Sequence, residues 1–213
     1  MKILNLYAGL GGNRKLWGAE HEVTAVEFDC KIMKQYEKFY PDDTIILDDA
    51  HRYLLEHFEE FDFIWSSPPC QSHTRMIRSG KSRQPRYPDL KLYEEILFLK
   101  HNFEGKWVVE NVVPYYTPFL EPKKFGRHLI WSNFEISDFK LESPKGFIMK
   151  CNTQGAEELK EWLGIRFPGN IYYGMNHDPA QVLRNCVHPK MGKHILDNIE
   201  KTKANLGDTE DEE

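Results

Sequence analysis

The chain has 213 residues, of which 40% are hydrophobic and 13% aromatic, enough to build the core of one domain with at most a small insertion. Its formal charge of −5 arises in the last seven residues, which carry five acids, so residues 1–206 are formally neutral. No apolar run approaches the roughly 20 residues that span a bilayer, and the N-terminus lacks a signal-peptide cleavage pattern, so we expect an intracellular protein without a membrane partner.

The four cysteines, Cys30, Cys70, Cys151 and Cys186, lie far apart and form no CxxC pair. This spacing argues against a zinc site and against a disulfide framework, so we predict no metal. Cysteine most often packs as a small buried hydrophobic residue, and we expect this of three of the four. Cys70 is the exception because of its surroundings in the sequence.

Short apolar runs alternate with helical patterns, which predicts an α/β fold with a mixed, mostly parallel sheet. Strands are expected at residues 3–7, 22–27, 44–47, 61–66 and 106–110, with a further strand pair through 128–136. Helices are expected at 31–39, 50–58, 90–103, near 156–163 and at 188–204. Residues 137–180 lose this rhythm. We therefore divide the chain into a main domain (1–136 and 181–204), a short insertion (137–180) and an acidic disordered tail (205–213).

Glycines follow the first expected strand, in the run Tyr7-Ala8-Gly9-Leu10-Gly11-Gly12. Glycines at this place let the backbone approach a ligand at the carboxyl edge of the sheet. A tight strand-to-helix turn would explain them equally well.

Acids end the next two expected strands. Glu27 can accept hydrogen bonds from the ribose hydroxyls of an adenosine, as acids do in dinucleotide-binding folds, and Phe28 can stack on the adenine. Asp48 and Asp49 can receive the adenine amino group. Together with the glycines, these features predict an adenosine-type cofactor without separating NAD from S-adenosylmethionine.

Cys70 follows the fourth expected strand, in Ser66-Ser67-Pro68-Pro69-Cys70-Gln71. The prolines fix the backbone and place the cysteine just beyond the sheet edge, where ligands of such folds bind. A thiolate that adds to C6 of cytosine makes C5 able to accept a methyl group from a sulfonium, which is covalent catalysis.

Glu110 ends the fifth expected strand, in Glu110-Asn111-Val112. During thiolate addition the cytosine ring must accept electron density at N3, so a nearby carboxylic acid should protonate that atom or hydrogen-bond to it. Glu110 fits this role if burial raises its pKa. The two motifs on consecutive strand ends favour a catalytic Cys70 over a structural one.

These motifs resemble those of the DNA cytosine-C5 methyltransferase family, in the family's order. YAGLGG at 7–12 is similar to its first motif, AVEFD at 25–29 to the second, and the Asp49 region to the third. PPCQ at 68–71 resembles the fourth, LYEEI at 92–96 the fifth and ENV at 110–112 the sixth. RNCV at 184–187 resembles the final cofactor motif, Gly-Asn-x-Val.

The resemblance covers about residues 3–130 and 181–200. PPCQ disfavours the amino-methyltransferases of DNA, in which an aromatic residue follows the Pro-Pro. The compact size resembles the small phage-type members, so the cytoplasm of a bacterial or phage-infected cell and a role in DNA methylation of the restriction–modification kind are expected.

The resemblance implies a Rossmann-like methyltransferase fold, the cofactor S-adenosylmethionine, and double-stranded DNA with a cytosine flipped into the pocket. It implies Cys70 as nucleophile, Glu110 at N3, and Arg127 as the basic residue of the eighth motif. The implied cofactor contacts are Tyr7, Ala8, Gly9, Gly11, Gly12, Glu27, Phe28, Asp49, Pro68, Leu92, Asn185 and Val187.

The segment after the cysteine is a mobile DNA-closing loop in this family, and here it is basic. Six basic residues against one acid lie between Arg75 and Lys91. Such a run alone is more often a solvated face, but its position favours phosphate contacts. The expected DNA-binding residues are Gln71, Arg75, Arg78, Lys81, Arg83 and Arg86.

Three features depart from the family's pattern. The eighth motif, Gln-x-Arg-x-Arg, is reduced to Arg127 and His128, and Arg184 replaces the glycine of the final motif. The insertion at 137–180 is a short recognition region, so we expect a DNA site of about two to four base pairs. Its candidate reading residues are Asn152, Thr153, Gln154, Arg166, Asn170, Asn176 and His177.

Three other functions remain open from the sequence. A branch of the same family methylates transfer RNA, so RNA is an alternative substrate. A catalytically silent nucleic-acid-binding protein is a second alternative, which the intact Cys70 and Glu110 disfavour. An NAD-dependent oxidoreductase would explain the glycines and Glu27 but would leave PPCQ and ENV without a role. We expect a monomer.

Overall fold

The first expected strand lies inside a sheet, with a strand on either side. The structure is a computed structural model that describes residues 1–78, 87–144, 146, 151–173 and 177–207. Within these residues seven strands form one sheet, in the order β3-β2-β1-β4-β5-β7-β6. The strands are β1 (Lys2–Leu6), β2 (Glu22–Glu27), β3 (Thr44–Leu47), β4 (Phe63–Ser66), β5 (Lys106–Val112), β6 (Lys123–Phe125) and β7 (His128–Ser132).

The first five strands are parallel to one another, and β7 and β6 join the sheet by antiparallel pairing. β5 pairs with β7 in antiparallel register, and β7 pairs with β6. The chain passes from β1 outward to β3 and then returns to place β4 on the other side of β1. This reversal creates a topological switch point, at which α/β proteins bind ligands beyond the carboxyl ends of the strands.

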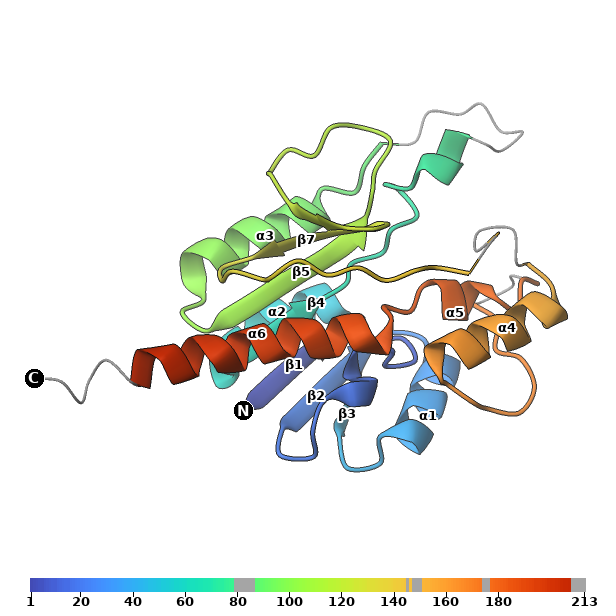
Figure 1. Cartoon of the computed structure of the whole chain (residues 1–213), viewed down its shortest axis with the longest axis horizontal. Helices are drawn as coiled ribbons and strands as arrows, with labels where there is room; N and C mark the ends of the chain where they lie inside the picture. The colour runs from blue at the N-terminus through green and yellow to red at the C-terminus, as the bar shows by residue number, and fades with distance from the viewer. Residues whose placement is uncertain (79–86, 145, 147–150, 174–176, 208–213) are drawn as a thin grey trace, which may run out of the picture.

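Helices cover both faces of the sheet (Figure 1). On one face, α2 (Ala50–His57) and α3 (Lys91–Asn102) pack over buried side chains such as Leu4 and Ile64. On the other, α6 (Pro189–Gly207) packs with the short 3-10 helix η1 (Asn13–Leu16) over Ile3, Phe63 and Trp65. The central strand β4 is buried along its whole length because both of its faces are covered.

Two acids at strand ends also cap helices. The Asp29 carboxylate accepts hydrogen bonds from the backbone N–H groups of Lys31 and Ile32 and begins α1 (Cys30–Phe39). The Asp49 carboxylate accepts the N–H of Arg52 and begins α2. Both carboxylates therefore have a structural role as helix caps, independent of any ligand that they bind.

The segment expected as an insertion contains α4 (Thr153–Leu163) and is followed by α5 (Gln181–Arg184). Both helices lie beside α1 (Figure 1). Leu159, Leu163 and Leu183 share a buried cluster with Ile32 of α1. Asn152, a candidate reading residue, accepts the N–H of Gly155 and caps α4, as Asn commonly does at helix starts.

Several expectations need correction. The strand pair expected at 128–136 is a hairpin of β6 and β7 that turns at Gly126, whose φ of +60° suits glycine. Within the described residues no strand follows Ser132. A disordered tail was expected from residue 205, but α6 continues to Gly207; residues 208–213 lie outside the described part. Three buried cysteines were expected besides Cys70, but Cys30 and Cys151 are exposed and only Cys186 is buried.

The remaining strands and helices, including the fifth strand, start and end within about three residues of the expected positions. Among the described helices, none is both long and apolar enough to cross a membrane.

Candidate active site

A pocket of about 400 Å³ opens at the carboxyl edge of the sheet. Its lining comes from the ends of β1, β2, β4 and β5, from the β6–β7 turn and from the segment around α5. Most of the expected site residues meet here: Tyr7, Ala8, Gly9, Gly12, Glu27, Phe28, Asp49, Pro68, Cys70, Gln71, Glu110, Arg127, Asn185 and Val187.

Glu27 connects the glycine-rich segment at residues 7–12, called here the glycine turn, to the end of β2 by hydrogen bonds. One carboxylate oxygen accepts the backbone N–H of Gly9 at 2.9 Å, and the other accepts those of Phe28 and Asp29 at 2.9 and 3.0 Å. Burial raises the pKa of the Glu27 carboxyl, although these three hydrogen bonds oppose the rise. A carboxylate offers about four lone-pair positions, so one acceptor position remains for a ligand.

The glycine turn meets the final motif at a very close contact. A Cβ at Gly12 would lie 2.4 Å from the carbonyl oxygen of Val187 and 3.0 Å from the Cβ of Cys186. Only glycine allows this approach. Gly11 differs from the expectation, because it does not line the pocket: with a φ of +70°, it packs against the rings of Tyr36 and Tyr40.

Tyr7 is held in a strained conformation at the end of β1. Its φ is +55°, in a region that favours glycine, and its hydroxyl donates to Glu95 at 2.6 Å. Glu95 is fully buried and also accepts from the Ser66 hydroxyl, with His51 Nδ1 at 3.0 Å. This network supports the floor of the pocket from α3.

Glu95 was missed by the sequence reasoning, and Leu92 was placed wrongly. Leu92 is 2% exposed, packs in the core beneath α3, and does not line the pocket. The helical period puts Leu92, Glu95 and Ile96 on the inward side of α3, which was the available signal that Glu95 is buried.

Cys70 lies half-buried in the pocket on a loop that is fixed from two sides. The Asn111 side chain donates to the carbonyl oxygen of Pro68 at 3.0 Å. After the cysteine, the N–H groups of His73 and Thr74 both donate to the Cys70 carbonyl oxygen. Burial, together with the nearby Glu110 charge, raises the pKa of the Cys70 thiol, while Arg127 acts in the opposite direction.

Glu110 is buried, and its electrostatics differ from the expectation. Burial by itself would raise its pKa, but the neighbouring His128, the Arg127 guanidinium and the Ser67 hydroxyl outweigh burial, so the pKa lies below its ordinary value. His128 Nδ1 lies 2.6 Å from a carboxylate oxygen of Glu110. The expectation that the pKa of Glu110 is raised overall was therefore wrong, because its neighbours favour the ionised carboxylate.

Arg127 reaches the pocket from the β6–β7 turn. Its guanidinium donates to the carbonyl oxygens of Arg184 and Cys186, at 2.9 and 3.2 Å. It thus connects the strand pair to the final motif and places a positive charge beside Cys70 and Glu110. Arg184, which stands where the family has glycine, forms an ion pair with Asp178.

The structure covers only the start and the end of the basic run. Gln71 lines the pocket, and the Arg75 side chain donates to the carbonyl oxygen of Pro114. Arg78 belongs to the short helix η3 (Arg75–Arg78). Lys81, Arg83 and Arg86 lie outside the described residues.

Other pocket residues were not foreseen from the sequence. Tyr173, in the segment expected to read DNA, lines the pocket together with Glu27 and Asn185. Burial raises its pKa, with a further contribution from the Glu27 charge. Asn111 and His128 also line the pocket; both stand beside residues that the sequence had singled out.

Comparison with known proteins identifies a family. A family model described as C-5 cytosine-specific DNA methylase matches residues 1–114. A tRNA (cytosine(38)-C(5))-methyltransferase of Mus musculus is 27% identical over 118 residues, covering 53% of this chain and 28% of that protein. Its Homo sapiens counterpart of the same name is 29% identical over 92 residues, covering 40% and 24%. The chain thus spans about a quarter of the length of these relatives.

Two solved structures are also similar to this chain. A mutant of DNMT2 from Spodoptera frugiperda has a TM-score of 0.38 at 26% identity, covering 52% of this chain and 35% of that one. A putative DNA modification methyltransferase encoded within a prophage of E. coli has a TM-score of 0.35 at 20% identity, covering 55% and 33%.

Proposed function

Because the chain belongs to the C-5 cytosine-specific DNA methylase family and uses S-adenosylmethionine, we propose that it methylates carbon 5 of cytosine in double-stranded DNA through a covalent Cys70 adduct. One observation carries the proposal. Cys70, Glu110 and Arg127 line the same pocket as the glycine turn and Glu27. The groups needed for methyl transfer and those suited to an adenosine cofactor therefore meet at one sheet edge.

The pocket fits S-adenosylmethionine in both size and chemistry. Its volume of about 400 Å³ lies within the range of small-molecule sites. Glu27 keeps an acceptor position for a ribose hydroxyl, and the exposed Phe28 ring is accessible for stacking on adenine. A Cβ at Gly9 would meet no atom closer than 3.9 Å, so this glycine leaves the backbone open toward the pocket. When bound, the sulfonium supplies an electrophilic methyl group.

The protonation states suggest how the chain prepares cytosine for attack. The raised pKa of Cys70 keeps a proton on the sulfur, and the lowered pKa of Glu110 keeps its carboxylate ionised. As the Cys70 sulfur bonds to C6, the thiol proton passes through Glu110 to N3 of the ring. The sulfur loses one proton and N3 gains one, so no external acid is required.

The later steps reverse this transfer. Once C5 carries the methyl group, it loses its proton to solvent water as the Cys70–C6 bond breaks. N3 returns its proton through Glu110 to the Cys70 sulfur, which restores the thiol and the carboxylate. Arg127 holds its position through two backbone carbonyls and stabilises negative charge beside Cys70 and Glu110 throughout.

We assign the remaining parts of the chain by the same proposal. Gln71 and the basic run from Arg75 to Arg86 contact the DNA around the flipped cytosine. Residues 137–180 act as the recognition region on a catalytic domain of residues 1–136 and 181–204. The protein works as a monomer in the cytoplasm of a bacterial or phage-infected cell.

A second substrate class is favoured by the relatives' names. Both curated relatives are named tRNA (cytosine(38)-C(5))-methyltransferases, so a structured RNA is the alternative substrate for the same chemistry. A catalytically silent binding protein is disfavoured because Cys70, Glu110 and Arg127 are all present in the pocket.

A methyl-transfer assay separates these possibilities. Purified protein is incubated with S-adenosylmethionine labelled in its methyl group and with either duplex DNA or total transfer RNA. We expect label in 5-methylcytosine of DNA. Label only in RNA would move the proposal to the second class, and no label in either would contradict it.

Duplex DNA containing 5-fluorocytosine tests the covalent step, because fluorine cannot leave C5 as a proton does. We expect an adduct stable to denaturing electrophoresis only when cofactor is present. Cys70→Ala should form none, while Cys30→Ala, at an exposed cysteine outside the pocket, is the matched control. An adduct in Cys70→Ala would remove Cys70 from the mechanism.

A further inference from the structure

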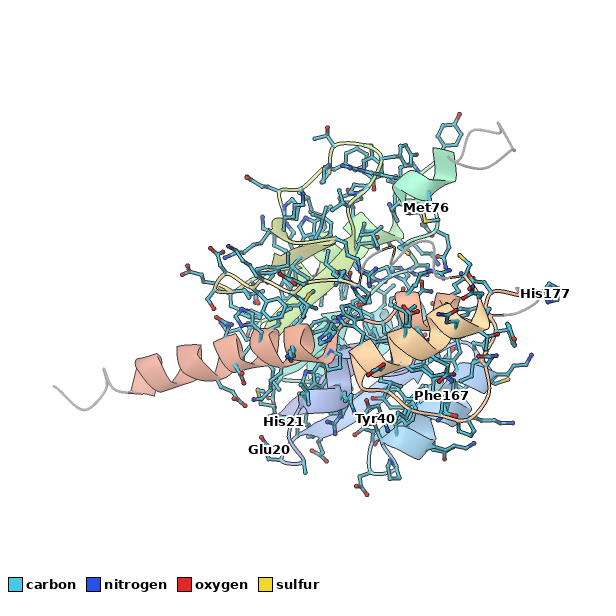
Figure 2. The ribbon with its side chains drawn as sticks, turned by 45° about the vertical axis from the view of Figure 1, so that its right-hand side comes forward. Glu20, His21, Tyr40, Met76, Phe167 and His177 are labelled. Atoms are coloured by element: carbon cyan, nitrogen blue, oxygen red, sulfur yellow. The ribbon has the colours of Figure 1, made fainter. Side chains whose placement is uncertain are left out.

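Glu20, His21 and Glu200 form a cluster at the amino end of the sheet, remote from the pocket. Glu20 and His21 immediately precede β2, and Glu200 lies on α6. In the described part of the chain, this is the one group of three or more acidic, histidine or cysteine side chains whose ligand atoms lie within 4.8 Å of one another. Figure 2 shows Glu20 and His21 side by side at the edge of the molecule.

The unusual member is His21. Its side chain is 4% exposed, and neither ring nitrogen has a hydrogen-bond partner. Buried polar atoms in native proteins are nearly always satisfied, so this imidazole calls for a specific explanation. Its Nε2 atom points toward two carboxylates, 3.5 Å from Glu20 Oε1 and 3.6 Å from Glu200 Oε1.

These separations suit ligands that share an ion better than they suit hydrogen bonds. Bonds of about 2.0–2.2 Å from a tetrahedral ion to nitrogen and oxygen place neighbouring ligand atoms about 3.3–3.6 Å apart. A direct hydrogen bond would bring nitrogen and oxygen to about 2.7–3.2 Å. Both carboxylate oxygens therefore already lie at ligand spacing from the His21 nitrogen.

We propose that His21, Glu20 and Glu200 bind one divalent transition-metal ion such as zinc, with water at the fourth coordination position. An imidazole with two carboxylates suits zinc or manganese, whereas magnesium prefers oxygen ligands alone. The cysteine spacing predicted no metal because this site uses no cysteine and joins residues far apart in the chain.

The ion would fasten α6 to the sheet. Ile195 and Ile199 of α6 already pack against Ile3 and Val23, and Glu200 stands at the end of this buried stretch. None of the three ligands lines the pocket. The site is therefore structural, and the inference does not depend on the methyltransferase proposal.

Metal-free full-length protein, prepared by dialysis against a chelator, provides the test. Equilibrium dialysis with zinc should give one ion per chain. At about 100 times its dissociation constant, zinc should raise the thermal midpoint by roughly 5–10 °C. Cobalt, used as a visible probe, should show the absorption bands of a four-coordinate site with nitrogen and oxygen ligands.

Three variants locate the ion. Glu200→Gln, at a half-exposed position that folding tolerates, should weaken zinc binding by at least about tenfold. His21→Asn should abolish the midpoint shift. His57→Asn removes an exposed histidine that lies 2.7 Å from Glu60, and it should bind zinc as the natural chain does.

Three results would overturn the proposal. The first is an absence of zinc binding at micromolar concentrations. The second is zinc affinity in Glu200→Gln and Glu20→Gln equal to that of the natural chain, which would place the ion elsewhere, for example at a cysteine. The third is an equal shift with magnesium, which would exclude the proposed class of ion.

Discussion

His128 and Glu110 are joined across the antiparallel β5–β7 pair by a 2.6 Å contact between Nδ1 and a carboxylate oxygen. Because the carboxylate accepts, the ring carries its proton on Nδ1 in this contact. His128 directly follows Arg127, the residue assigned to the family's eighth motif. The partner of the buried carboxylate is therefore an imidazole, whose pKa is lowered by burial, rather than a permanent cation.

This contact predicts a shifted pH profile. In His128→Leu, burial of Glu110 is opposed by fewer neighbours, so its pKa rises. Activity that needs the ionised carboxylate holds above that pKa and falls as the pH drops through it. The acid limb of kcat/KM should therefore move to higher pH, and kcat should fall by about 10–100-fold.

Matched variants distinguish this role from general damage. His128→Asn keeps an N–H donor and should lie between His128→Leu and the natural chain, while the exposed His57→Asn should change nothing. An acid limb that stays in place in His128→Leu would show that Glu110 does not set it.

The raised pKa of Cys70 predicts slow alkylation near neutral pH. The thiolate is the reactive form, so the rate with iodoacetamide should rise about tenfold per pH unit and level off at a higher pH than for an ordinary exposed cysteine. Arg127→Leu removes the group that lowers this pKa, so its midpoint should lie at still higher pH. Peptide mass spectrometry follows Cys70 separately from Cys30 and Cys151. A Cys70 midpoint below pH 8 would contradict the burial argument.

Glu27 should control cofactor affinity. Removing a hydrogen bond between a ribose hydroxyl and this carboxylate should cost about 1.5–3 kcal/mol of S-adenosylmethionine binding, measured by calorimetry on Glu27→Ala. Glu27→Gln keeps an acceptor for the N–H of Gly9 and should lose less affinity. Glu22→Gln, at the exposed start of the same strand, is the control. Unchanged affinity in Glu27→Ala would refute the role.

The basic run should bind phosphates without reading sequence. Arg78→Ala combined with Lys81→Ala should weaken binding to all DNA duplexes alike and reduce the slope of log affinity against log salt by roughly two. Lys34→Ala combined with Lys38→Ala, on α1, removes the same charge elsewhere. An identical slope in the first double variant would count against the loop.

The short region 137–180 predicts limited sequence discrimination. Each bidentate contact to a base edge gives about 1–3 kcal/mol of discrimination, and a recognition segment this small offers few of them. Asn152 is already engaged in capping α4. Bisulfite sequencing of a plasmid methylated by the protein should show a site of about two to four base pairs. Six or more specified pairs would require a partner that reads DNA or a much larger contribution from this region.

The sequence by itself determined which residues meet at the pocket. Parallel strands place their carboxyl ends at one edge, so motifs that follow β1, β2, β4 and β5 had to converge there. Gly9, Glu27, Cys70 and Glu110 could be assigned to one site for this reason, and they all line it.

Tertiary structure alone decided the details that depend on contacts between distant segments. The ionisation of Glu110 is set by His128 from an antiparallel neighbour, which no local pattern encodes. Gly12 faces Val187 while Gly11 faces Tyr36, because the path of the turn selects which glycine meets which segment. The cluster of His21 with Glu200 exists only because α6 folds back over the start of β2.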